Sequence, residues 1–263
     1  MDLPANRTDH IRLKHFSYRA EVTHHTLELK GLPAELEGAT IVQLTDLHCG
    51  YGGTDPVLHW AVEQTRALNP DFILITGDFI DDHCKVKDYP LAKLLRPLCA
   101  KRAIYACYGN HDHRHGLAEV SEKLSDAGIP LLINQAVEAA PGFWIAGIDD
   151  LHEGSPNLEK TLREVPQERT ALVLSHNPSL IDSASDHNIM IFSGHTHAAQ
   201  MHIPFPSPKL VCKIHLHCNQ VEGWYHNGKA SLYVCRGIGV TGFPMRINCP
   251  AELPVFHMHN AGS

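Results

Sequence analysis

Five short apolar runs, each followed directly by polar residues, constrain the fold more than any other feature of the sequence. The runs cover residues 41–45, 72–76, 104–108, 171–174 and 189–192. Their length, their β-branched residues and the glycine or polar residue that ends each one are typical of buried parallel strands. In open α/β sheets, the carboxyl ends of such strands border the ligand crevice. The pattern therefore predicts that the polar residues gather at one edge of the sheet.

The polar residues at these strand ends are of types that bind metal ions. They belong to the motifs Asp46-Leu47-His48, Gly77-Asp78, Gly109-Asn110-His111-Asp112, Leu174-Ser175-His176 and Gly194-His195-Thr196-His197.

In an extended segment, both Asp-x-His and His-x-His place their two ligands on the same side. Each pair is therefore predicted to bind one cation. Imidazole, carboxylate and amide groups without a thiolate suit Mn, Fe or Zn. Because the ligands are too many for one tetrahedral ion, the sequence predicts two ions that share Asp78.

Length and charge limit the organisation and the partners of the chain. At 263 residues it is near the size at which a single core stops growing. We therefore expect one domain over residues 1–263, with an N-terminal strand extension at 1–38 and a β-rich part at 198–263. The net charge of −7, without a block of Lys and Arg, argues against a nucleic-acid partner. The oligomeric state cannot be predicted from the sequence.

The distribution of cysteines and of apolar residues predicts the cellular location of the protein. The eight cysteines are scattered without a Cys-x-x-Cys pair, which favours a reducing compartment. Residues 1–12 contain no apolar run, and no stretch approaches the roughly 20 apolar residues of a membrane span. We expect a soluble, cytoplasmic protein, and peripheral contact with the inner membrane face stays open.

The segments between the apolar runs carry helix and turn signals. Helices are expected from Thr54 or Asp55 to before Pro70 and at 89–100, 117–126 and 157–165. A further short helix is expected to begin at Pro178. Residues 15–29 predict one or two edge strands, and further strands are expected at 131–134, 136–139 and 143–148. Beyond His197 we expect antiparallel strands at 200–203, 223–226, 231–235 and 255–259. Together the elements predict a two-sheet α/β sandwich with helices on the outside.

The order of the five motifs resembles that of the calcineurin-like metallophosphoesterases. Residues 236–250, from Arg-Gly-Ile-Gly to Asn-Cys-Pro, are similar to the YkuE-type branch of that superfamily, which includes enzymes that act on UDP-2,3-diacylglucosamine. The resemblance covers most of the chain and implies a dinuclear centre. It implies that one metal binds Asp46, His48, Asp78 and His197, and that the other binds Asp78, Asn110, His176 and His195. It also implies that His111 is a catalytic histidine outside the ligand set and that Asp112 orients it.

The resemblance implies hydrolysis of a phosphodiester or pyrophosphate bond. Two cations about 3.5–4 Å apart would hold the attacking and leaving oxygens, and a hydroxide bridging the cations is expected to attack phosphorus directly. The branch implies a lipid-linked or nucleotide-sugar substrate and a role in lipid metabolism. Two alternatives stay open: a broad phosphodiesterase or phosphomonoesterase for soluble substrates, and a non-catalytic scaffold with a vestigial metal site. The scaffold is disfavoured because no ligand is missing.

Four further groups of residues have a structural and a functional interpretation. His113 and His115 are expected to be solvated loop residues. The spacing of Cys212, His215, His217 and Cys218 matches no common zinc site, so an edge strand with incidental Cys and His is favoured. Residues 201–208 form either a packed proline-rich loop or an apolar rim that contacts an acyl chain or a bilayer. Arg236 and Arg246 either meet a phosphate or form surface ion pairs.

Overall fold

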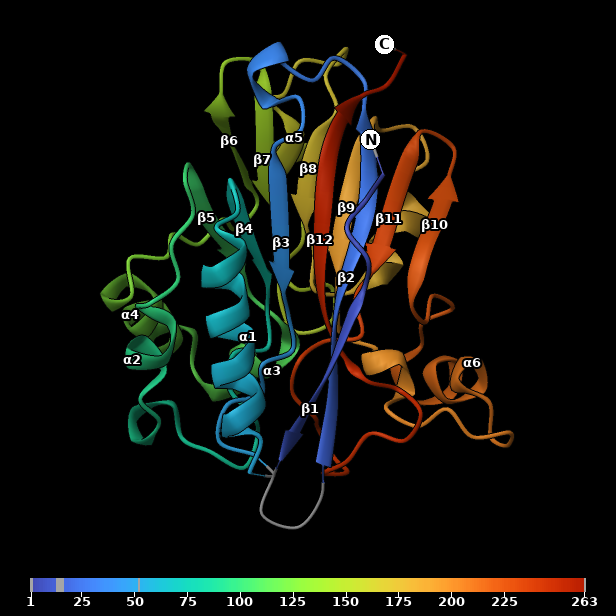
Figure 1. Ribbon diagram of the computed structural model, residues 1–263. Coiled ribbons are helices and arrows are strands. Elements are labelled where there is room, and N and C mark those ends of the chain that lie inside the picture. Colours follow the sequence, from blue (N-terminus) through green and yellow to red (C-terminus); the bar gives the residue numbers. More distant parts are fainter. Residues whose placement is uncertain (1, 13–16, 52, 263) are drawn as a thin grey trace.

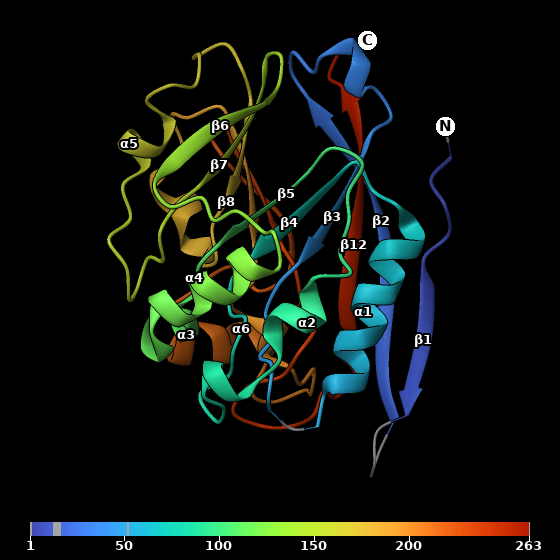
Figure 2. The same ribbon diagram turned by 90° about the vertical axis from the view of Figure 1, so that its left-hand side faces the viewer.

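The computed structural model describes residues 2–12, 17–51 and 53–262, which form two six-stranded sheets packed face to face (Figures 1 and 2). The first sheet has the order β1 (Arg7–Arg12), β2 (Ser17–Leu29), β12 (Ala251–Asn260), β3 (Thr40–Leu44), β4 (Phe72–Thr76) and β5 (Ala103–Cys107). The second has the order β10 (Gly223–Asn227), β11 (Ala230–Val234), β9 (Ile189–Ser193), β8 (Ala171–Leu174), β7 (Phe143–Gly147) and β6 (Gln135–Ala140).

Each sheet contains a block of parallel strands: β3, β4 and β5 in the first sheet, and β7, β8 and β9 in the second. The predicted motifs follow all of these strands except β7. The C-terminal strands are antiparallel where β10 pairs with β11 and where β12 pairs with β3. Two of their pairings are parallel, however: β11 with β9, and β12 with β2. Figure 1 shows β12 between β2 and β3, so the two ends of the chain complete the first sheet together.

The apolar runs are continuous because the central strands are buried on both faces. Along β4, Phe72 and Leu74 belong to the core between the two sheets, while Ile73 and Ile75 belong to the core on the outer face. The same alternation in β8 places Leu172 between the sheets and Val173 outside. A two-sheet sandwich with helices outside, as predicted, is therefore confirmed.

The helices cover the outer faces of the sheets. Apolar side chains of α1 (Asp55–Leu68), α2 (Leu91–Leu95) and α4 (Leu117–Asp126) share a core with the outer face of the first sheet. The short helix η3 (Pro178–Ser183) and α5 (Leu158–Leu162) cover the second. The other helical segments are α3 (Asn110–His115), α6 (Pro208–Val211), η1 (Ala34–Leu36), η2 (Val86–Asp88), η4 (His197–Ala199) and η5 (Cys212–Leu216).

Several predicted elements are confirmed and others are wrong. The helices expected at 54–69 and 117–126 are α1 and α4. The helix expected at 89–100 shortens to α2 because prolines 90 and 97 border it, and the one at 157–165 shortens to α5. The strand expected at 131–134 is wrong, since Leu131 makes only an isolated bridge. The strand at 200–203 is also wrong: residues 197–199 form η4, and Met201 makes a single bridge to Ile247.

The N-terminal prediction needs a correction too. Strand β2 is not an edge strand, because β1 pairs with it on one side and β12 on the other, and β1 forms the edge. His15, Phe16 and Gly52 lie outside the described residues. No helix in the described ranges is long and apolar enough to cross a membrane. The assignment of the whole chain to a single domain stays a prediction.

Candidate metal centre

The predicted residues meet where parallel strands of both sheets end. Asp46 and His48 follow β3, Asp78 follows β4 and Asn110 follows β5; His176 follows β8, and His195 and His197 follow β9. All seven side chains belong to buried residues. The centre therefore lies between the two sheets and takes residues from each.

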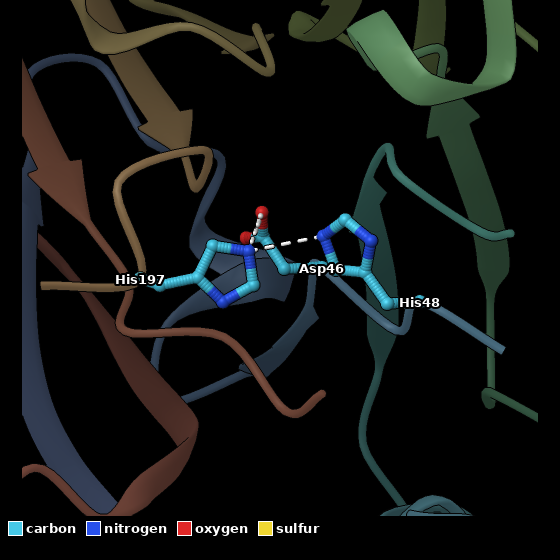
Figure 3. A group of neighbouring side chains, drawn as sticks. All are labelled: Asp46, His48 and His197. Atoms are coloured by element: carbon cyan, nitrogen blue, oxygen red, sulfur yellow. Dashed lines mark hydrogen bonds and ion pairs between the residues drawn. The ribbon is translucent and has the colours of Figure 1, made fainter. Parts of the chain in front are cut away.

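The first group consists of Asp46, His48 and His197 (Figure 3). The Nε2 atoms of the two imidazoles are 3.0 Å apart. His197 Nε2 also lies 3.2 Å from Asp46 Oδ1. Figure 3 shows the three side chains turned toward one another, so their lone pairs face a common space.

The second group lies beside the first and contains His176, His195 and Asn110. His195 Nδ1 is 3.0 Å from Asn110 Oδ1 and 3.2 Å from His176 Nε2. The Asp78 carboxylate connects the groups: its Oδ2 lies 3.1 Å from His176 Nε2 and 3.4 Å from His48 Nε2. The two clusters thus share one carboxylate.

The spacing of these atoms fits ligands of metal ions. Ligand atoms that lie about 2.0–2.2 Å from one ion in tetrahedral or octahedral geometry are roughly 2.8–3.6 Å from each other. The contacts between His48 and His197, His176 and Asp78, and His195 and His176 range from 3.0 to 3.2 Å. Because imidazole and carboxylate lone pairs repel at such distances, a positive charge between them stabilises the arrangement. The residues present therefore fit two divalent cations.

The backbone at five of the seven candidate ligands is not extended. The argument that a spacing of one residue places both side chains of a pair on the same side therefore does not apply. Asp46, His48, Asp78, His195 and His197 all have positive φ, between 43° and 71°. Such a backbone is costly for residues other than glycine and is concentrated at functional sites. The Asp-x-His pair does face one space, as expected. The His-x-His pair does not: the His197 imidazole lies beside His48, and the His195 imidazole lies beside His176.

Backbone amides and two glycines position the carboxylates. The His195 N–H donates to both Asp46 oxygens, at 3.0 and 3.1 Å, and the His111 N–H donates to Asp78 Oδ1 at 2.9 Å. A Cβ atom on Gly194 would collide with the Asp46 carboxylate, and one on Gly109 with the Asp78 carboxylate. The glycines of both motifs are therefore needed for the close approach of carboxylate to backbone.

Burial and neighbouring charges set the protonation of the centre. Burial lowers the pKa of His195 to about 3 and that of His197 to about 4, so both offer neutral lone pairs. Burial also acts to lower the pKa of His176, but the Asp78 carboxylate outweighs it and raises the pKa to about 10. The pKa of Asp78 lies well below its ordinary value, since His176 overcomes the effect of burial. Asp78 and His176 thus stabilise the charged forms of each other.

His111 lies at the centre, but Asp112 does not orient it. The His111 ring stacks edge-on against His48, with centroids 4.7 Å apart, and its Nδ1 lies 2.9 Å from Asp82 Oδ1. Asp112 instead accepts three backbone N–H groups at 2.9 Å, those of Asp78, Phe79 and Gly109. The Asp112 carboxylate therefore stabilises the turn that carries Asp78. The resemblance implied that Asp112 orients His111, and the structure does not show this contact.

Sequence reasoning missed three acids around the centre. The first is Asp81, whose Oδ2 lies 3.2 Å from His48 Nδ1 and whose side chain is fully buried. Asp82 is the second, and Asp149 is the third; Asp149 contacts His113 Nε2 at 2.8 Å. Asp149 and Asp150 directly follow the strand predicted at 143–148. A search for polar residues at the ends of apolar runs would therefore have identified them.

Asp81 lies on the Nδ1 side of the His48 imidazole, whose other nitrogen, Nε2, faces the first group. Outer carboxylates of this kind typically change metal affinity by about 10–100-fold. We therefore expect Asp81→Asn to weaken binding of one Mn²⁺ ion by roughly 10–100-fold. Titration of metal-depleted protein, followed by metal analysis, measures the effect. Asp88→Asn, an exposed acid on η2, is the matched control, and equal affinities of the two variants would contradict the role of Asp81.

The remaining candidates lie outside the two groups. His113 and His115 are not solvated as expected, since they contact Asp149 and Asp82, both at 2.8 Å. Cys212 and Cys218 are buried while His215 and His217 are exposed. These four residues lie on and beside η5 instead of on an edge strand, and they form no candidate ligand group among the described residues.

The two arginines have structural partners. Arg246 donates from Nη2 to the carbonyl oxygens of Arg236 and Gly239, both at 2.7 Å, and lies 3.3 Å from His197 Nδ1. It therefore supports the backbone behind His197, and it forms no ion pair with an acid in the part of the chain that the structure describes. Arg236 does form ion pairs, to Glu21 at 2.9 Å and to Glu222 at 3.5 Å, and its side chain is largely buried.

The fold and the clustered ligands agree with comparisons to known proteins. The calcineurin-like phosphoesterase family matches residues 39–199, and the chain belongs to this family. Its members use divalent metal ions, and the chain is a metal-dependent phosphoric ester hydrolase.

Among its relatives is the metallophosphoesterase YkuE of Bacillus subtilis, 32% identical over 90% of this chain and 84% of the relative. Phosphodiesterase YaeI of Escherichia coli is 29% identical over 83% of this chain and 81% of the relative. A Helicobacter pylori metallophosphoesterase is 29% identical over 89% of this chain, which spans 63% of that relative. A solved dimetal phosphatase from Danio rerio shares the fold, with a TM-score of 0.50 and 14% identity over 77% of this chain and 88% of that one.

Proposed function

We propose that the chain hydrolyses a phosphodiester or pyrophosphate bond at a dinuclear centre. Asp46, His48, Asp78 and His197 would hold one ion, and Asp78, Asn110, His176 and His195 the other, with Mn, Fe or Zn as the metals. The observation that carries this proposal is the position of the Asp78 carboxylate, within 3.4 Å of both His48 and His176. One carboxylate between two ligand clusters is the arrangement that a pair of neighbouring ions requires.

The chemistry would divide between the ions and the chain. Bound ions would neutralise charge on the phosphoryl oxygens and would make water a better nucleophile. His111, held by Asp82 at 2.9 Å, is positioned beside His48 to donate a hydrogen bond to a phosphoryl or leaving oxygen. No nucleophilic side chain is assigned, so water is proposed to attack phosphorus directly. Inversion of configuration at a chiral phosphorothioate supports this route, and retention contradicts it.

The substrate class follows from the surroundings of the centre and from the branch resemblance. Large apolar side chains, among them Phe205 and Phe243, are exposed on the loops that follow His197 and Arg236. Such surfaces suit a lipid-linked substrate, and a nucleotide-sugar diphosphate has the bond that a dinuclear centre cleaves. The alternative is a broad phosphodiesterase or phosphomonoesterase for soluble substrates. A vestigial scaffold is less well supported, because each expected ligand has an atom within 3.4 Å of another one.

A substrate panel tests the proposal. With added Mn²⁺, we expect hydrolysis of bis-p-nitrophenyl phosphate to exceed that of p-nitrophenyl phosphate, and UDP-2,3-diacylglucosamine to be cleaved at its pyrophosphate. Faster turnover of the monoester would favour the soluble alternative. If none of the three is hydrolysed by protein that contains metal, the scaffold is favoured instead.

The cellular placement is part of the same proposal. All eight cysteines are free thiols, and six of them are buried. Free thiols are typical of proteins in a reducing compartment, so a cytoplasmic location is proposed. Peripheral contact with the inner membrane face would bring the centre to lipid-linked phosphoesters.

A further inference from the structure

Exposed apolar side chains gather on two segments beside the metal centre, residues 201–217 and 242–248, which we call the rim. Among the described residues, six large hydrophobic side chains are notably exposed, and five of them lie on the rim. These five are Phe205 (81% exposed), Ile214 (57%), Phe243 (49%), Leu210 (39%) and Ile247 (36%). Large exposed apolar side chains that are concentrated on neighbouring segments often mark a contact site.

The two segments of the rim are joined to each other and to the metal centre. The His202 N–H donates to the Ile247 carbonyl at 2.8 Å, and the Ile247 N–H donates to the Gln200 carbonyl at 2.9 Å. The first segment continues directly from η4, which begins at His197. The second contains Arg246, 3.3 Å from His197 Nδ1. The backbones of both rim segments are therefore anchored close to the first ligand group.

The charge of the rim differs from that of the rest of the chain. The whole protein has 29 acidic residues and a net charge of −7, yet Glu222 is the one acid between residues 198 and 251. On the helical stretch α6–η5, Lys209 and Lys213 are exposed four residues apart. Leu210 and Ile214 repeat the same spacing one residue later, so a cationic row runs beside an apolar row.

We propose that the rim binds the surface of an anionic lipid bilayer. Apolar side chains that enter the headgroup boundary beside lysines that meet anionic headgroups are the two contributions that hold amphipathic segments at a membrane. Protein interfaces, by contrast, are depleted in lysine, and the rim presents two lysines between its apolar side chains. The inference rests on the proposed function only in placing a phosphoester substrate at that surface; binding to lipid does not depend on catalysis.

Vesicle sedimentation tests the inference with the full chain. We expect the protein to bind vesicles of phosphatidylglycerol and phosphatidylcholine more tightly than vesicles of phosphatidylcholine alone. Leu210→Ser with Ile214→Ser should reduce binding by roughly tenfold or more, because both apolar contacts are lost. Lys209→Gln with Lys213→Gln should remove the preference for the anionic vesicles. Lys93→Gln with Lys160→Gln, exposed lysines on α2 and α5, is the matched control and should bind like the wild type.

Activity toward a soluble diester separates this inference from the proposed function. Hydrolysis of bis-p-nitrophenyl phosphate should be unchanged in both rim variants, which also shows that they fold. The inference is overturned if the wild type does not bind anionic vesicles, if the rim variants bind as well as the control, or if the rim mediates self-association in place of lipid binding. If the protein binds vesicles but has no diesterase activity, the proposed function is overturned and the inference about lipid binding still holds.

Discussion

Replacement of Asp78 by asparagine should lower the rate of diester hydrolysis by roughly a thousandfold, because the change removes the charge that both ligand groups share. The side chain is buried, with Oδ2 within 3.4 Å of His176 and His48. Its Oδ1 accepts the His111 N–H at 2.9 Å, and an asparagine oxygen can keep that hydrogen bond. The loss should therefore come from metal binding and not from a collapsed loop.

Two measurements separate these causes. Metal analysis should show that Asp78→Asn retains fewer ions per chain than the wild type, while its circular dichroism spectrum is unchanged. Asp126→Asn, an exposed acid on α4, serves as the control and should keep full activity. A variant at position 78 with normal metal content and a normal rate would show that Asp78 is not the shared ligand.

His111→Asn should lower kcat by about 10²–10³ without a change in metal content, since the proposed role is proton donation. The ring is next to His48 and has Asp82 on its Nδ1, but it belongs to neither of the two proposed ligand sets. A diester with a poor leaving group should lose more activity than bis-p-nitrophenyl phosphate, because p-nitrophenolate leaves without a proton.

His115→Asn is the matched control for this variant. His115 contacts the same Asp82 oxygen, at 2.8 Å, yet it is outside the two proposed ligand sets, so its replacement should have little effect on kcat. Loss of bound metal in His111→Asn would make His111 a ligand. Equal losses for good and poor leaving groups would argue against proton donation.

The sandwich and the clustering of the candidate ligands could be predicted because they depend on local patterns. Strands buried on both faces must be apolar throughout, as β4 and β8 are, and the chemistry at their carboxyl ends interrupts that pattern sharply. The candidate ligands at positions 46, 78 and 176 were found for this reason. Helix α1 was likewise predicted by its proline at the first turn and the proline after its end.

The predictions that were wrong or missing concern contacts between segments far apart in the sequence and residues with positive φ. The position of β12 between β2 and β3 depends on pairing across more than two hundred residues, which no local pattern contains. The positive φ values at Asp46 and His195 invalidated the argument from an extended chain. Asp81 and Asp82 were missed because they lie in a loop after the motif, where acids are common, and their contacts to His48 and His111 are visible only in three dimensions.

The position of Mn²⁺ in crystals of the wild-type protein, located by anomalous scattering, tests the central claim most directly. We predict two ions about 3.5–4 Å apart, with the Asp78 carboxylate bound to both. His48 and His197 should ligate one ion, and His176 and His195 the other. A single ion, or two ions without a shared carboxylate, would contradict the account.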